Sequence, residues 1–599
     1  MFKRVPGLLT MVALASTVAA PIAFQSRESG EWKRIRTANL VVVGNAGESE
    51  LRRSAHNLEE FRRTLQRVFP AIKQTSPVPT VVVLLKNEAA FARFRPRDER
   101  GKPRSTLSGY FTAGPDVGYM VLYPGGNNRS ETYDLLFHEY THFVLRQNLR
   151  QVPSWLNEGI AEFYSTFESD YRDGKALLGR VVEHRLRTLR ERPLLPLARM
   201  LTEEGSYNLI RDPGTVSMFY AQSWALVHYL ELGENGKRQG QLTAYLRALE
   251  RGRSQEDAFA DAFATTFEGL QRELRAYVNR PTFSAVLIDR GTSELAAPAV
   301  ELMSEADAHY VQGDLLVRVG AAKEADDELG MALREDAGHA NARIARARAW
   351  LQLDRVDEAI ALLREVPAAS PSHYAAQLQL AGALRAAKRH DDALVASRAA
   401  LKLDPRSASA WYGISLSSMA LGRSQDAEQS LANTVALDPD PEWYRAHAYA
   451  AFRHGVHSLV VKDAAAYLKE SGTESETAAY VAFLAAMSHR KLAQAAQAQQ
   501  LLSQVKGAIM AGSWAEKVMS FLEGRLNESQ FMPLAKTNGE QTEAHTYIGV
   551  LAAFAGNRAA AIEHLRWVKE RGSRNFMEYP VAVAELERLE NAAPAAKMP

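Results

Sequence analysis

A fixed period of 34 residues runs through the second half of this 599-residue chain, and it constrains the fold more than any other feature of the sequence. Small residues and prolines recur at that interval, and the recurring positions are Ala325, Ala359, Ala393 and Ala427, with Pro371, Pro405 and Pro439. A small residue where two helices cross and a proline after the second helix predict a series of helix pairs. Because one such pair cannot bury a core alone, the pairs must stack on their neighbours.

This pattern resembles the tetratricopeptide repeat family. In the unit that begins at Ala408, Trp411 and Ile414 fall on apolar positions of that family. The resemblance implies an all-α tetratricopeptide solenoid over residues 300–598. Solenoids of this kind present a concave surface, so we expect a protein partner for this region.

The composition is that of a nearly neutral globular chain, with 46% hydrophobic and 24% charged residues. Lys plus Arg is 72 against 70 for Asp plus Glu, so the chain has no strong positive field, and we expect no nucleic-acid partner. There is no cysteine, which excludes disulfides, thiolate metal sites and a cysteine nucleophile. Any metal ion must therefore be held by histidine and carboxylate side chains.

The first residues have the three-part pattern of a secretory signal peptide. Lys3 and Arg4 precede a short apolar run, and small residues follow as far as Ala20. The run is shorter than the ~20 residues that a membrane-spanning helix needs, so we predict that residues 1–20 are removed. The mature chain is then expected to have no membrane span and to be exported, in the periplasm of a Gram-negative bacterium.

Residues 31–285 combine strand and helix patterns. A helical pattern separates the first two of three β-rich runs, and mostly helical patterns follow from about residue 130 to residue 280. The β-rich runs are 33–45, 79–85 and 109–126. These patterns predict an α+β domain, with a small sheet and a helical region behind it.

Residues 138–142 of that helical region read HEYTH. On a helix, His138 and His142 lie one turn apart on the same face and can offer two imidazoles to one metal ion. Glu139 lies about 100° round the helix axis, where a glutamate can act as general base toward water. The alternative is a pair of core histidines whose ring nitrogens are satisfied by carbonyl groups.

Glu158 follows within the segment PSWLNEGIAEFY. Here the chain resembles the gluzincin metallopeptidases, and in particular bacterial peptidase MA-like proteins. The resemblance implies one Zn²⁺ ion held by His138, His142 and Glu158, with Glu162 bonding a ligand histidine from behind. The spacing from His142 is shorter than in aminopeptidase N or thermolysin, where it would reach nearly to Glu162, so both glutamates remain candidates for the third ligand.

Cleavage of a peptide bond also needs a donor for the developing oxyanion. Related enzymes take it from a later helix, and Tyr220 and His228 in MFYAQSWALVHYL are the candidates. The segment before the zinc helix lacks the GAMEN-like strand of gluzincin aminopeptidases, which favours an endopeptidase acting on a peptide or protein. The alternative hypothesis is a non-catalytic repeat scaffold or adaptor with a vestigial metal-binding domain.

Overall fold

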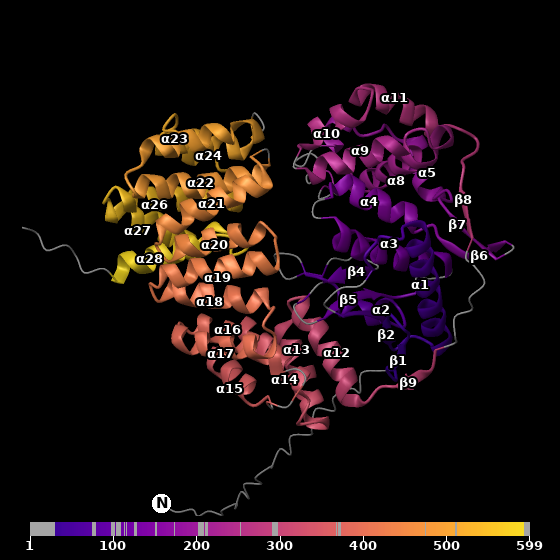
Figure 1. Ribbon diagram of the computed structural model, residues 1–599, viewed down its shortest axis with the longest axis horizontal. Coiled ribbons are helices and arrows are strands. Elements are labelled where there is room, and N and C mark those ends of the chain that lie inside the picture. The colour runs from indigo at the N-terminus through magenta and orange to yellow at the C-terminus, as the bar shows by residue number, and fades with distance from the viewer. Residues whose placement is uncertain are drawn as a thin grey trace, which may run out of the picture.

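The computed structural model (Figure 1) describes most of the chain between residues 30 and 591. Short stretches within this range are not described: 75–78, 98–101, 104–108, 113, 115–116, 125–128, 150–151, 173, 202–208, 210–211, 213, 252, 290–297, 367, 369, 371–372, 474 and 510–511. The predicted signal peptide at 1–20 and Pro371 lie outside the described residues. None of the described helices combines the length and the apolar character that crossing a bilayer requires.

A mixed sheet of six strands organises the N-terminal region, in the order β4-β5-β3-β2-β1-β9. Its strands are β1 (Lys33–Arg36), β2 (Val41–Gly44), β3 (Thr80–Leu84), β4 (Gly109–Thr112), β5 (Gly118–Leu122) and β9 (Val300–Leu302). The β2–β3 and β3–β5 pairs are parallel, and the other pairs are antiparallel. The edge strand β9 comes from the beginning of the range predicted for the repeats.

Some helices of the N-terminal region contact this sheet, and others pack behind them in the layer that carries the candidate site. They are α1 (Glu48–Val68), α2 (Glu88–Ala92), α3 (Arg129–Asn148), α4 (Ser154–Tyr164), α5 (Glu183–Glu191), α6 (Leu197–Met200), α8 (Val216–Leu232), α9 (Gln239–Glu250), α10 (Gln255–Ala262) and α11 (Phe267–Val278). α3 packs against α4, and α8 packs against both α4 and α5.

A second, three-stranded antiparallel sheet adds two strands to the mostly helical region between residues 130 and 280 and a third strand just after it. It consists of β6 (Glu168–Arg172), β7 (Lys175–Leu178) and β8 (Val286–Asp289). Gly174, at a φ of 71°, stands at the turn between β6 and β7. An Asp-Gly pair is a strong hairpin signal, and it outweighs the helical pattern on either side.

The C-terminal region is a stack of helices. They are α12 (Glu305–Arg318), α13 (Ala322–Glu335), α14 (Ala340–Gln352), α15 (Val356–Arg364), α16 (His373–Ala386), α17 (His390–Leu403), α18 (Ala408–Ala420), α19 (Ser424–Leu437), α20 (Glu442–Arg453), α21 (His457–Ser471), α22 (Glu476–Lys491), α23 (Ala495–Gln504), α24 (Trp514–Leu522), α25 (Glu528–Phe531), α26 (Asn538–Phe554), α27 (Arg558–Arg571) and α28 (Glu578–Asn591). The four recurring alanines, Ala325, Ala359, Ala393 and Ala427, are each 0% exposed, as expected where two helices cross. The predicted fold class, an α+β region followed by stacked helical repeats, is confirmed.

The two faces of the six-stranded sheet belong to different cores, because side chains alternate along each strand. Val42 and Val82 face a core that contains α1, α3 and α4. Val43 and Val83 face the opposite way and share a core with Leu315 of α12. The first repeat helix therefore covers the face of the sheet that lies away from the candidate site.

Candidate metal centre

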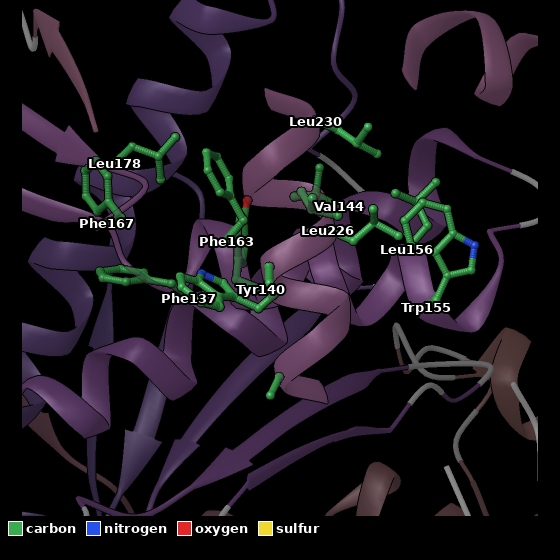
Figure 2. Close-up of a cluster of buried hydrophobic side chains, with 14 of the residues drawn as sticks. Phe137, Tyr140, Val144, Trp155, Leu156, Phe163, Phe167, Leu178, Leu226 and Leu230 are labelled. Carbon is green, nitrogen blue, oxygen red and sulfur yellow. The ribbon is translucent and has the colours of Figure 1, made fainter. Parts of the chain in front are cut away.

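α3 and α4 are fixed in place by the apolar side chains that they bury (Figure 2). Tyr140 and Val144 of α3 are buried, and so are Leu156 and Phe163 of α4. Helix α8 contributes Leu226, which is 0% exposed. Because these side chains interlock at near-crystalline density, the polar residues on the same helices have little freedom to shift.

Gly159 of the WLNEG segment lets α4 approach α8 closely. A Cβ atom at this position would lie 2.5 Å from the backbone oxygen of Ser223 on α8, which is too close for any other residue. This contact gives the glycine a packing role, and it brings α8 up to the helix that carries Glu158 and Glu162.

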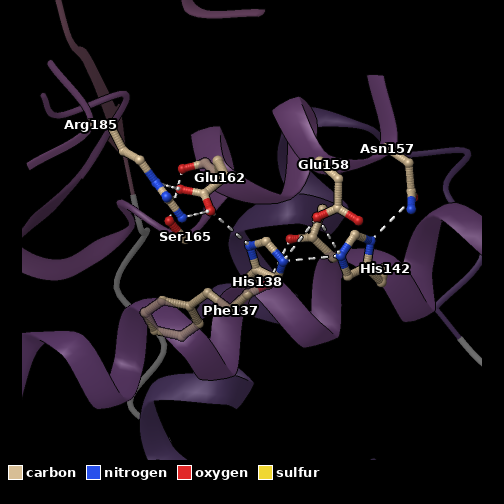
Figure 3. Close-up of polar contacts among 9 residues, drawn as sticks. Phe137, His138, His142, Asn157, Glu158, Glu162, Ser165 and Arg185 are labelled. Carbon is tan, nitrogen blue, oxygen red and sulfur yellow. Dashed lines mark hydrogen bonds and ion pairs between the residues drawn. The ribbon is translucent and has the colours of Figure 1, made fainter. Parts of the chain in front are cut away.

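His138, His142 and Glu158 converge on one point between α3 and α4 (Figure 3). Their candidate ligand atoms all lie within 4.8 Å of one another. The two histidine Nε2 atoms are 3.0 Å apart, and Glu158 Oε2 lies 3.5 Å from each of them. This is the predicted set of residues, and it can hold a metal ion.

The triangle formed by these three atoms is of a size that would fit a tetrahedral zinc ion. Zinc bonds to nitrogen and oxygen are about 2.0–2.1 Å long, so two ligands of a tetrahedral zinc ion lie about 3.4 Å apart. The three edges here, 3.0, 3.5 and 3.5 Å, bracket that value. Glu158 Oε2 is buried and has no hydrogen-bond partner in the described part of the protein, so it retains the capacity to bind an ion.

The pKa values of these groups show how strongly they interact. Burial alone would lower the pKa of His138, but the carboxylates of Glu158, Glu162 and Glu139 outweigh it and raise the pKa to about 9. Burial alone would raise the pKa of Glu158, but the two imidazoles outweigh it and lower the pKa to about 2. The carboxylate is therefore ionised at neutral pH, as a metal ligand must be.

The Nδ1 atoms of both histidines face other polar groups. His142 Nδ1 lies 3.1 Å from Asn157 Oδ1, and His138 Nδ1 lies 3.9 Å from Glu162 Oε1. Glu162 in turn accepts two hydrogen bonds from Arg185 of α5, at 2.7 and 3.2 Å. Glu162 thus stands behind His138, on the side away from Glu158 (Figure 3).

Glu139 is 9% exposed and lies beside the two imidazoles without joining the triangle. In the described part of the chain its carboxylate forms no hydrogen bond and no ion pair. Burial raises its pKa, and the charges of His138 and His142 oppose that rise. A buried carboxylate of this kind accepts a proton more readily than an exposed one does.

Tyr220 and His228 of α8 occupy different environments. Burial and the charges of Glu158 and Glu162 raise the pKa of Tyr220 well above its usual value. The Arg185 guanidinium lies 5.4 Å from the centre of that ring. His228 lies in the core instead, with its two ring nitrogens 2.8 Å from Tyr277 Oη and 2.9 Å from Gly179 O.

Sequence reasoning missed two residues of this site, Arg185 and Asn157. Asn157 directly precedes Glu158, so its position within the WLNEG segment was a usable signal. Arg185 stands 23 residues after Glu162, on another helix, and no local pattern points to it.

Comparison with known protein families gives matches to two separate parts of the chain. Residues 136–254 match the family described as "Protein of unknown function (DUF1570)". Residues 316–384 and 384–448 match the tetratricopeptide repeat. A search of curated proteins gave no significant match.

Two solved structures show weak overall similarity. A MamA mutant is 24% identical over 22% of this chain and 77% of its own, with a TM-score of 0.20. The Cut9 and Hcn1 hetero-tetramer of the APC/C is 14% identical over 78% of this chain and 77% of its own, with a TM-score of 0.29. The two family matches alone show a domain of the DUF1570 type at residues 136–254, followed by tetratricopeptide repeats, and neither of them is a peptidase family.

Proposed function

We propose that this protein is a zinc-dependent peptide-bond hydrolase, an endopeptidase whose repeat region binds a protein partner. The observation that carries the proposal is the triangle of His138, His142 and Glu158, which has the edge lengths of a zinc site and an unpartnered carboxylate oxygen. Imidazole nitrogen and carboxylate oxygen are ligands that zinc prefers, and three protein ligands are typical of catalytic zinc sites.

The remaining polar residues fit the other tasks of hydrolysis. Bound zinc would supply Lewis acidity toward water and the peptide carbonyl. Glu139 would accept the proton of the attacking water and return it to the leaving amine, so that water is added across the C–N bond. Tyr220, near the three carboxylates, would donate a hydrogen bond to the carbonyl oxygen as it gains negative charge.

Glu162 and Arg185 would hold His138 in place. Arg185 grips the Glu162 carboxylate with two hydrogen bonds, and Glu162 Oε1 faces His138 Nδ1. Carboxylates behind ligand histidines fix the orientation of the ring and raise its basicity. This arrangement supports Glu158 as the third ligand and Glu162 as the group behind His138.

The alternative function is a repeat scaffold that binds metal without turnover. Glu139 argues against it, because a protein that only holds zinc has no use for a buried carboxylate that lies outside the ligand set. The N-terminal pattern at residues 1–20 further supports an exported, periplasmic enzyme.

The test is to measure zinc and cleavage on the same purified protein. We expect one zinc per chain, with only nitrogen and oxygen neighbours in X-ray absorption. Mass spectrometry of a mixed peptide library should then show cleavage that a chelator abolishes and added zinc restores. Absence of stoichiometric metal would refute the zinc site, whereas bound zinc without any cleavage would favour the scaffold.

A further inference from the structure

The last helix of the array, α28, packs back onto a helix that lies several elements earlier in the chain. It contacts its neighbours α26 and α27, and it also contacts α20 (Figure 1). The turn between α16 and α17 reaches the same helix, through an ion pair of 2.8 Å between Lys388 Nζ and Glu587 Oε2. Arg588 of α28 donates a hydrogen bond to the carbonyl oxygen of Arg453, at the end of α20. α28 therefore closes the C-terminal part of the array on itself.

Two glutamates are buried where this closure is made. Glu543 of α26 is 5% exposed and Glu578 of α28 is 6% exposed. Their hydrogen-bond donors are neutral: Trp514 Nε1 lies 3.0 Å from Glu543 Oε2, and the Tyr547 hydroxyl donates to Glu578 Oε1, also at 3.0 Å. A small cavity at this point is lined by Glu578, by Tyr547 and by Tyr449 of α20. In the described part of the chain neither carboxyl forms an ion pair, and a buried carboxylate without a cation is costly.

The elements packed around the two carboxyls supply no counter-charge to them. The charged and titratable groups on these elements are Arg445 and Tyr449 of α20, Tyr467 of α21, and Glu476 and Tyr480 of α22. Arg445 is the cation of this set, and it is paired with Glu442. Glu476 adds a third acid. The buried pair is therefore surrounded by hydroxyl groups and by further negative charge.

This environment favours the protonated form of the pair. Burial raises the pKa of Glu543 well above its usual value, and the charges of Glu578 and Glu476 act in the same direction. Burial also raises the pKa of Glu578, although hydrogen bonds, one of them from Tyr547, oppose the rise. Two like charges in one buried site disfavour each other, so the pair retains a proton at a pH where an exposed glutamate has lost it.

We propose that Glu543 and Glu578 form a pH-sensitive latch, which holds α28 against α20 while the pair keeps a proton and releases the helix as the pair ionises. In the released state both carboxyls face water and have ordinary pKa values. The closed state therefore binds more protons than the released one, so closure is strongest at acidic pH and weakens as the pH rises toward the raised pKa values of the pair. Release exposes Tyr449 and Tyr547. The proposal depends neither on zinc nor on hydrolysis.

Histidines near the other end of α28 have the opposite pH dependence, which fixes the range of the test. Burial lowers the pKa of both His454 and His457 to about 4, and the charge of Arg588 acts in the same direction. Burial likewise lowers the pKa of His390, whose ring faces that of His454. Protonation of these rings below their ordinary pKa of ~6.5 would favour release. Above pH 7 they are neutral in the closed state and largely neutral in the released state, so the carboxyl pair decides.

The test is hydrogen–deuterium exchange of the full chain, expressed as protection factors of α28 and α20 at pH 7, 8 and 9. Protection factors are corrected for the faster intrinsic exchange at higher pH. We expect protection of both helices to fall by up to about 10-fold per pH unit for each proton lost, while that of α12 to α19 stays constant. The double variant Glu543→Gln with Glu578→Gln keeps both hydrogen-bond acceptors but cannot ionise, so its protection should not depend on pH.

The matched control is Glu570→Gln, which makes the same change at an exposed position of α27 and should keep the wild-type profile. Glu543→Gln alone should give an intermediate slope, because Glu578 can still ionise. Wild-type protection of α28 that stays constant or rises from pH 7 to pH 9 would overturn the proposal without any variant. So would a pH dependence that persists in the double variant. A parallel loss of protection in α12 to α19 would also overturn it, because the whole array would then open.

Discussion

Both halves of the molecule hold histidines between helices, but the ring nitrogens of these histidines have different partners. In the N-terminal half, His138 and His142 point their Nε2 atoms at each other and at a carboxylate oxygen that has no hydrogen-bond partner. In the repeat array, His447 is 0% exposed and lies 2.8 Å from Ser415 Oγ through Nε2 and 2.6 Å from Asp463 Oδ2 through Nδ1. The first cluster can therefore bind a metal ion. The second is closed, because both ring nitrogens of its histidine already have hydrogen-bond partners.

The closed cluster contains the residue types of a nucleophilic triad, yet its hydrogen bonds exclude that chemistry. Ser415 donates its one hydroxyl proton to the carbonyl oxygen of Ala427, at 2.6 Å. His447 must therefore donate to Ser415, and it cannot take a proton from it. The cluster joins α18, α19, α20 and α21, and its role is structural. Residue types alone do not mark a functional site, whereas unsatisfied polar atoms at the right distances do.

The largest expected effect is on turnover at the open cluster. Glu139→Gln leaves His138, His142 and Glu158 in place, so zinc should still bind with unchanged stoichiometry. It removes the proton acceptor, and general-base catalysis is worth ~10²–10⁴ in rate, so cleavage should fall by that factor. Peptide cleavage and zinc content are measured on the same preparation.

The matched control for this variant is Glu191→Gln, which makes the same change at an exposed position of α5. It should cleave at the wild-type rate. If Glu139→Gln also cleaves at that rate, the hydrolase proposal loses its general base.

A substitution in the closed cluster should reduce stability instead of activity. His447→Ala leaves Asp463 buried without its partner, and breaking a buried pair in this way costs about 3–5 kcal/mol. His142→Ala should reduce the free energy of unfolding by less, because that cluster is not closed. This variant is measured with a chelator present, so that no bound metal contributes to stability. Thermal melting of the two variants measures the difference, and equal losses would mean that both clusters are structural.

The sequence predicted what depends on short-range patterns. The 34-residue period located the helix crossings at Ala325 and Ala393, and the HEYTH and WLNEG segments contained the residues that converge. It could not show that Arg185 reaches Glu162, because no local sequence pattern indicates which residues of a later helix lie beside α4. For the same reason it missed that β9, which follows the helical region, completes the N-terminal sheet.

A smaller effect distinguishes the two glutamates of α4. Glu162→Ala should weaken zinc binding about 10- to 100-fold, the usual cost of losing a group that orients a ligand. Glu158→Ala removes a ligand and should prevent retention of zinc through gel filtration. Competition against a chromophoric chelator gives the affinities, and the reverse order would make Glu162 the third ligand.

The pH dependence of zinc binding should follow His138. Without metal, its pKa is raised to about 9, so below that pH the imidazole carries a proton that zinc must displace. Affinity should therefore rise about 10-fold per pH unit from mildly acidic pH toward pH 9, with about one proton released per ion. Calorimetry in buffers of different ionisation enthalpy measures that proton. Release of no proton below pH 8 would show that His138 is already neutral in the metal-free protein.

The smallest expected effect concerns two turns of the array, where backbone conformation alone decides whether glycine or alanine is favoured. Gly422 has a φ of 73° with no atom within 4 Å of an added Cβ, and Ala493 has a φ of 59° in a comparable turn. A residue with a Cβ pays about 1–2 kcal/mol in this left-handed region, whereas glycine loses about 0.5–1 kcal/mol more entropy on folding. Gly422→Ala should therefore destabilise the array by about 0.5–1 kcal/mol, and Ala493→Gly should stabilise it by a similar amount. Thermal melting measures both changes, and zinc content should stay constant, since neither residue touches the metal cluster. If the two substitutions shift Tm in the same direction, side-chain contacts rather than backbone conformation control these turns.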